Sequence, residues 1–275
     1  MDLHDYKDVA VNYDRYLEVM FGSPEQDDSF QKFYLELAKR YGEGGVVDIA
    51  CGTGAVLLYL AEQGIQVDGT DISEEMCQVA KNKASEKNLD LNIYTSDMTK
   101  FDSGRKYSLA IIARSGFMHL PDPELQRAAL LNIREQLTPG GILTLNTFDP
   151  FPPIQAQQMN TTPEDYTFRL KYINSDGNPE EIYNAISYDL FTQHMFGNWK
   201  FVTYNNDGEV IGERIRPLLM RQTYRYEMKW LIELCGFELL DIYRGYHGDK
   251  EDLKDASSAK KYNGNLIWIL RKKEQ

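Results

Sequence analysis

Residues 46–64 read VVDIACGTGAVLLYLAEQG, and this stretch decides the fold class of the 275-residue chain. Val46–Ile49 is a short run rich in β-branched residues, the pattern of a buried parallel strand. The run leads into Gly52-Thr53-Gly54, and good helix formers then continue to a stop signal at Gly64. The stretch therefore predicts a strand, a tight glycine turn and a helix, in that order.

The alternation of strands and helices continues along the chain. Ser73 caps the next predicted helix, which carries Glu74 and Glu75 in its first turn. Amphipathic helices are also predicted at residues 124–137 and 224–235. Further strands are predicted at residues 65–70, 91–95, 107–113, 142–148, 237–243 and 265–270. This rhythm predicts an α/β fold with a doubly wound, mostly parallel sheet of seven strands.

Residues from about 165 to 217 break this rhythm with short aromatic and β-branched runs. Two clusters among them, residues 175–178 and 205–208, have the chemistry of hairpin turns. We therefore expect an inserted antiparallel sheet that roofs the active site or forms a subunit interface, with His194 and Arg216 as polar residues to test. The predicted domains are an N-terminal helical lid at residues 1–42, a Rossmann-like domain at residues 43–150 and 221–275, and the inserted subdomain at residues 151–220.

The composition limits the classes of function. The formal net charge is −12, and the lysines and arginines are spread along the chain, so no positive stripe for nucleic acid is visible. The three cysteines, Cys51, Cys77 and Cys235, lie far apart in no paired spacing, which suits a reducing compartment. The N-terminus carries no apolar run typical of a signal peptide or a membrane span. We expect a cytoplasmic monomer or homodimer that binds neither nucleic acid nor membrane.

The glycine turn lets the backbone approach a ligand closely and directs helix N–H groups toward it. A dinucleotide fingerprint would need a third glycine where this chain has Leu57. Asp48 places a carboxylate inside the strand before the turn, and this charge would repel a pyrophosphate. An ammonium or a sulfonium cation would tolerate it. The turn therefore disfavours a nicotinamide-dependent oxidoreductase, which remains a weaker alternative.

Residues 45–149 resemble the class I S-adenosylmethionine-dependent methyltransferases, with the glycine turn and several later residues in matching order. The resemblance implies that the turn contacts the methionine part of S-adenosylmethionine and that Asp71 accepts hydrogen bonds from the ribose hydroxyls. It also implies that Ile72 packs on the adenine and that Asp97-Met98 reads its edge, while Pro139-Gly140-Gly141 precedes the fifth strand as in the family. The predicted cofactor-binding residues are Asp48, Ala50, Cys51, Gly52, Thr53, Gly54, Asp71, Ile72, Met76, Asp97, Met98, Arg114 and Tyr16.

Simpler explanations exist for the same residues taken one at a time. Asp71 could be a strand-end turn residue, Asp97 a helix cap and Met98 a core residue. We interpret Cys51 as a small packed residue without a catalytic thiol role. The order and spacing of the whole set favour binding of S-adenosylmethionine, with S-adenosylhomocysteine as the product.

The predicted fourth strand ends at Arg114, and ligands of open parallel sheets lie beyond the carboxyl ends of the strands. His119 is the best candidate for a general base, because histidine titrates near neutral pH; it could instead brace the following helix. The segment from Phe117 resembles the glycine and sugar-amine N-methyltransferase branch. Tyr13-Asp14-Arg15-Tyr16 resembles a lid motif there, which gives Tyr13 a catalytic role, with ordinary helix packing as the alternative. No acidic cluster follows the fourth strand, so we predict a metal-independent reaction.

The sequence thus predicts an enzyme that transfers a methyl group to a nitrogen or an oxygen of a small-molecule acceptor, with nitrogen favoured. One alternative is a non-catalytic module that binds S-adenosylmethionine or S-adenosylhomocysteine. Another is a DNA or RNA amino-methyltransferase, because residues 149–153 (DPFPP) superficially resemble the signature of that group. The order of residues differs, and the run follows the fifth strand where that signature follows the fourth. We therefore disfavour this alternative.

Overall fold

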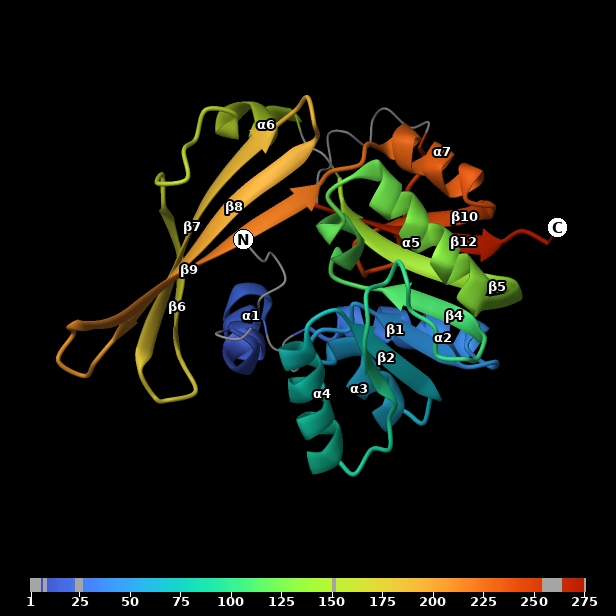
Figure 1. Ribbon diagram of the computed structural model, residues 1–275, viewed down its shortest axis with the longest axis horizontal. Coiled ribbons are helices and arrows are strands. Elements are labelled where there is room, and N and C mark those ends of the chain that lie inside the picture. The colour runs from blue at the N-terminus through green and yellow to red at the C-terminus, as the bar shows by residue number, and fades with distance from the viewer. Residues whose placement is uncertain (1–5, 7–8, 23–26, 150–151, 254–263, 275) are drawn as a thin grey trace. The chain divides into compact units, whose positions relative to one another are not determined.

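The computed structural model describes residues 6, 9–22, 27–149, 152–253 and 264–274, which fall into two compact units (Figure 1). The larger unit lies within residues 29–150 and 222–275, and the smaller within residues 1–28 and 151–221. The larger unit contains a Rossmann-like mixed sheet, and the smaller contains a separate four-stranded antiparallel sheet. The predicted fold class is confirmed.

The sheet of the larger unit has eight strands among the described residues, in the order β11-β10-β12-β5-β4-β1-β2-β3. The five strands from β1 to β5 run parallel, and β12 pairs antiparallel with both β5 and β10. Every residue of β1 is buried, as expected for a central strand covered on both faces. The strands are β1 (Val46–Ile49), β2 (Val67–Asp71), β3 (Ile93–Thr95), β4 (Tyr107–Ile112), β5 (Leu137–Phe148), β10 (Phe237–Arg244), β11 (Asp249–Lys250) and β12 (Asn265–Lys272).

Helices cover both faces of this sheet, as the strand–helix alternation predicts. One apolar cluster joins the sheet to α2 (Ser29–Tyr41), α3 (Ala55–Glu62) and α4 (Glu74–Glu86). A second cluster joins it to α5 (Pro123–Gln136) and α7 (Arg225–Leu234). The sheet is therefore doubly wound, and its carboxyl edge is left to the turns that follow β1, β2 and β4.

The structure departs from the sequence prediction at three places. Strand β11 is two exposed residues without an apolar pattern, so no signal predicted it. Residues 139–141, predicted as a turn, lie inside β5, where Gly140 has a φ of +68° and the pairing with β4 shifts register. Helix α2, inside the predicted lid, packs its buried face on the larger unit. Residues 150 and 151, where the insertion is predicted to begin, lie outside the described residues.

The smaller unit is built on an antiparallel sheet with the strand order β6-β7-β8-β9. Both predicted hairpin turns are confirmed: they join β6 to β7 and β8 to β9, and Gly177 and Gly208 each have a φ of +83°. Helix α1 packs on β6 around a shared apolar core. The elements are η1 (Ala10–Asn12), α1 (Tyr13–Phe21), α6 (Pro152–Gln158), β6 (Thr167–Ile173), β7 (Pro179–Asp189), β8 (His194–Tyr204) and β9 (Val210–Arg221).

A membrane-spanning helix needs about 20 mostly apolar residues. None of the described helices combines that length with that apolarity.

Candidate functional site

The glycine turn after β1 has the backbone conformation that its sequence predicts. Gly52 and Gly54 have φ angles of +56° and +88°, a region that glycine enters without steric cost. Helix α3 begins directly afterwards, at Ala55. A Cβ on Gly52 would meet nothing within 4 Å, so the backbone there is open to close approach by a ligand.

Asp71 at the end of β2 fixes the position of this turn. Its Oδ2 accepts a hydrogen bond from the Gly52 N–H at 2.8 Å, and its Oδ1 accepts one from the Ser73 N–H at 2.9 Å. The carboxylate is buried, with 8% of the residue exposed. Each oxygen has more than one acceptor direction, so these bonds leave capacity for hydroxyl donors. The predicted ribose acid is thus also the residue that holds the turn against β2.

Asp48 lies inside β1 and is almost completely buried, with 1% of the residue exposed. Its Oδ2 accepts the Leu57 N–H at 3.1 Å, whereas its Oδ1 has no hydrogen-bond partner among the described residues. Burial raises the pKa of Asp48 to about 8, the Leu57 N–H lowers it, and the charge of Asp71 raises it further. An unsatisfied buried carboxylate oxygen fits a site that receives a cation.

Three residues other than glycine have positive φ angles at the carboxyl ends of β1 and β4. They are Ala50 at +56°, Arg114 at +47° and Ser115 at +61°. Each such conformation costs on the order of 1–3 kcal/mol and tends to cluster at functional sites. A Cβ on Gly116 would lie 2.9 Å from the Cβ of Ala50, so the two strand ends are closely apposed.

The strained turn after β4 is held by residues that the sequence prediction did not select. The Ser115 hydroxyl donates to Oδ1 of Asn146 on β5 at 3.0 Å, and both residues are buried. The Asn146 amide in turn donates to the Leu266 carbonyl of β12 at 3.3 Å. These contacts join residues far apart in the sequence, so no local pattern could have indicated them.

Arg114 points its guanidinium at aromatic rings of the larger unit. Its Cζ lies 4.4 Å from the centroid of Phe30, a ring that also contacts Tyr34 and Tyr246. Burial raises the pKa of Tyr246 to about 12, while the Arg114 charge lowers it. The predicted cofactor residue Arg114 is thus positioned by a cation–π contact that the sequence did not reveal.

The residues predicted to contact the adenine, Ile72, Asp97 and Met98, lie in turns, and Met76, another predicted cofactor residue, lies on helix α4. Asp97 accepts the Thr99 N–H at 2.8 Å, and the Met98 carbonyl accepts the Asn132 amide at 3.0 Å. Ile72 is 42% exposed and free to pack on a ring, whereas Met76 is buried on the inner face of α4. Asp97 is therefore a turn-capping residue in this structure, and its role toward adenine stays a prediction.

The candidates for catalysis fall in different units. His119 ends the short 3₁₀ helix η2 (Gly116–His119) that follows β4 in the larger unit. Tyr13 and Tyr16 belong to α1 of the smaller unit, where Tyr16 contacts Tyr172 and Phe201 edge to face. Burial raises the pKa of Tyr16 well above its ordinary value. The described contacts of Tyr16 are those of ordinary helix packing, and the roles of both tyrosines stay predictions.

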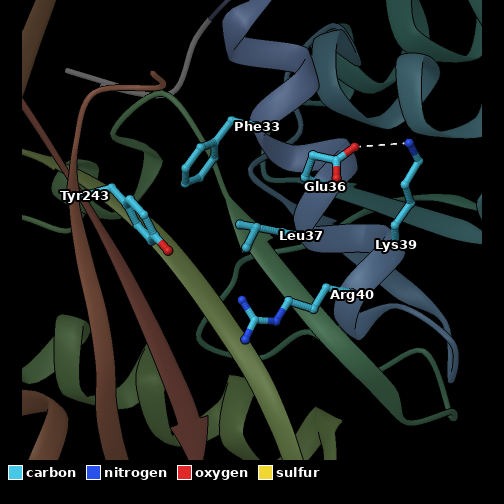
Figure 2. A pocket seen from close by; sticks show the side chains of 6 residues that line it. All are labelled: Phe33, Glu36, Leu37, Lys39, Arg40 and Tyr243. Carbon is cyan, nitrogen blue, oxygen red and sulfur yellow. Dashed lines mark hydrogen bonds and ion pairs between the residues drawn. The ribbon is translucent and has the colours of Figure 1, made fainter. Parts of the chain in front are cut away.

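Figure 2 shows a pocket on the larger unit, lined by five residues of α2 and by Tyr243 of β10. Glu36 and Lys39 form an exposed ion pair at 3.0 Å, and Phe33 meets Tyr243 edge to face. None of the predicted cofactor or catalytic residues lines this pocket. The pocket is therefore separate from the candidate site, which consists of the turns after β1, β2 and β4.

Within the described ranges, no group of at least three His, Cys, Asp or Glu residues is arranged to hold a metal ion. Cys51, within the glycine turn, is a buried free thiol. Burial raises its pKa well above the ordinary value, which agrees with a packed and unreactive residue. Metal independence of the reaction stays a prediction.

Residues 46–141, which include these turns, match a family model described as a methyltransferase domain. A Geobacillus sp. (strain WCH70) protein that carries a methyltransferase name is 28% identical over 244 residues, 86% of this chain and 90% of that protein. Glycine N-methyltransferase of Mus musculus is 31% identical over 131 residues, 42% of this chain and 44% of that protein. The crystal structure of an S-adenosylmethionine-dependent methyltransferase from Clostridium acetobutylicum ATCC 824 superimposes with a TM-score of 0.75 at 14% identity, covering 96% of this chain and 100% of that one.

Proposed function

We propose that this chain, a class I S-adenosylmethionine-dependent methyltransferase, transfers the methyl group to a nitrogen of a small-molecule acceptor by in-line displacement. The proposal rests above all on Asp71, whose Oδ2 accepts the Gly52 N–H at 2.8 Å. That bond joins the glycine turn to Asp71, the residue proposed to bind the ribose hydroxyls. Transfer to an oxygen is the closest alternative.

The residues of the site fit the functional groups of S-adenosylmethionine. Asp71 has acceptor capacity for the two ribose hydroxyls, and the turn at Gly52 is open to close approach. The unpartnered Oδ1 of Asp48 gives a buried carboxyl group, and a bound ammonium or sulfonium nearby would favour its ionised form. Once bound, S-adenosylmethionine supplies a methyl group that its sulfonium has already activated.

The protein's own contribution is mainly orientation and the exclusion of water. A well-oriented nucleophile can lower the barrier by about 7–11 kcal/mol compared with a freely diffusing one. An amine acceptor must be neutral to attack, and its extra proton then passes to a base or to solvent. Similarity to glycine N-methyltransferase over 131 residues supports nitrogen as the accepting atom.

We expect His119 to act as the base or as an orienting residue for the acceptor. His119→Ala should lower kcat by about 10²–10⁴-fold, because a positioned general base contributes that much. The affinity for S-adenosylhomocysteine should stay unchanged, since His119 is not among the residues proposed to hold the cofactor. His247→Ala, which changes an exposed histidine of the same unit, is the matched control. A wild-type rate in His119→Ala would leave His119 with a structural role only.

A panel of small amines and hydroxyl compounds tests the reaction itself. The chain is incubated with S-adenosylmethionine and each compound, and release of S-adenosylhomocysteine is measured. We expect turnover with at least one amine. Turnover with hydroxyl compounds alone would reassign the acceptor to oxygen. Tight cofactor binding without turnover on any compound would favour the non-catalytic binding module.

A further inference from the structure

The pocket in Figure 2 is lined only by residues of the larger unit and is separate from the candidate site. Its volume of about 370 Å³ falls in the range of about 300–1,000 Å³ that is typical of small-molecule sites. Two of its walls are aromatic, because the ring centroids of Phe33 on α2 and Tyr243 on β10 lie 5.4 Å apart with an angle of 76° between the ring planes. Leu37 of α2 adds an apolar side chain. A planar ring could therefore pack against three hydrophobic side chains here.

Two ion pairs beside the pocket neutralise their own charges. Glu36 and Lys39, which both line it, form an exposed pair at 3.0 Å. The Nζ atom of Lys250 lies 5.7 Å from the centroid of the Tyr243 ring and pairs with Asp241 at 2.6 Å. Neither pair therefore leaves an unmatched charge for a ligand.

Arg40, the remaining cation that lines the pocket, has no acidic partner among the described residues. Its guanidinium makes a cation–π contact instead, with Cζ 4.9 Å from the centroid of the Tyr41 ring. The hydrogen bond with Asp241 raises the pKa of Lys250, whereas the charge of Arg40 lowers it, so the two cations lie within range of mutual repulsion. An anion beside Arg40 would relieve that repulsion and would supply the acceptor that the described residues do not.

We propose that this pocket binds a small aromatic anion, with its ring against Phe33 and Tyr243 and its charged group on the Arg40 guanidinium. Figure 2 shows the Arg40 guanidinium and the Tyr243 hydroxyl on the same side of the pocket, next to Leu37. A guanidinium suits an oxyanion because its N–H donors lie in one plane, and a tyrosine hydroxyl can donate as well. The inference goes beyond methyl transfer, because none of the residues proposed for the cofactor or for catalysis lines the pocket.

Benzenesulfonate and benzenesulfonamide are the probes for this site, because they share a ring and differ in charge at neutral pH. Each is titrated into the full chain at constant ionic strength, and binding is followed by saturation transfer from the protein to the ring protons. We expect the wild type to bind the sulfonate about two- to fivefold more tightly than the sulfonamide, the range that an exposed charge pair supports. Arg40→Gln should remove this preference by weakening the sulfonate alone.

Phe33→Leu tests the aromatic wall. Leucine keeps the position apolar but removes the ring that meets Tyr243 edge to face. Both probes should therefore bind about two- to tenfold more weakly, and the sulfonate should still be preferred because Arg40 is intact. Unchanged affinity for both probes would contradict packing of their ring in this pocket.

Arg127→Gln is the matched control. Arg127 is an exposed arginine of α5, which covers the opposite face of the sheet from α2. Its affinities for both probes should equal those of the wild type. Equal binding of the two probes by the wild type, binding of neither, or a sulfonate preference that persists in Arg40→Gln would each overturn the proposal. Displacement of benzenesulfonate by saturating S-adenosylhomocysteine would overturn it as well, because the probe would then occupy the cofactor site.

Discussion

Replacing Asp71 with alanine should weaken binding of S-adenosylhomocysteine at least about a hundredfold. The carboxylate is proposed to accept the ribose hydroxyls, and hydrogen bonds to charged groups contribute about 1.5–3 kcal/mol each. The same change removes the acceptor for the N–H groups of Gly52 and Ser73, so the glycine turn loses its tie to β2. Isothermal titration calorimetry of the purified variant measures the loss directly.

Asp102→Ala provides the control for this experiment. Asp102 is an exposed aspartate of the same unit whose Oδ1 also accepts a nearby backbone N–H, that of Gly104 at 2.8 Å. Its removal should leave the affinity for S-adenosylhomocysteine unchanged. If Asp71→Ala binds as tightly as Asp102→Ala, then Asp71 is only a turn residue and its ribose role is wrong.

Replacing Asp48 with asparagine should make the chain without cofactor more stable at pH 8 and weaken its binding of S-adenosylmethionine. Burial raises the pKa of Asp48 to about 8, whereas an aspartate in an unfolded chain titrates near 4. Between those values the folded state holds a proton that the unfolded state has lost. Stability contributed by this group therefore falls as pH rises from about 4 to about 8, by on the order of a few kcal/mol.

Chemical unfolding of wild type and Asp48→Asn across this pH range tests the sign of the effect. The asparagine can still accept the Leu57 N–H but has no charge to desolvate. The difference in unfolding free energy, variant minus wild type, should grow steadily up to about pH 8 and then level off. Asp90→Asn, at an exposed position, should show no such growth. A pH-independent difference for Asp48→Asn would show that Asp48 is ionised in the folded chain throughout.

Local patterns were sufficient to predict most of the larger unit and both glycine-containing hairpin turns of the smaller unit. The glycine turn between β1 and α3, the cap at Ser73 and the hairpin turns around Gly177 and Gly208 all follow from backbone chemistry within a few residues. The two-residue strand β11 has no such pattern, because only pairing with β10 makes it a strand. The predicted lid at residues 1–42 was based on its helical pattern, whereas the packing of α2 on the sheet depends on contacts of its buried face with distant strands.

The residues of the candidate site also fall into those that local sequence could predict and those that it could not. Asp48 and Asp71 could be predicted because their roles depend on spacing within one strand–turn–helix segment. The cation–π contact between Arg114 and Phe30 could not be predicted, because it joins residues 84 positions apart, 114 minus 30. Arg216 was visible only as a polar residue in an aromatic sheet. Its Nε and Nη2 are buried and have no hydrogen-bond partner among the described residues, which depends on the three-dimensional contacts of β8 and β9.

The most direct test of the central claim is a calorimetric titration of the unmodified chain with S-adenosylhomocysteine, with NAD as the control ligand. The site built on Asp48, Gly52 and Asp71 predicts saturable binding of S-adenosylhomocysteine at one molecule per chain and no heat from NAD. Absence of S-adenosylhomocysteine binding, or saturable binding of NAD, would contradict it.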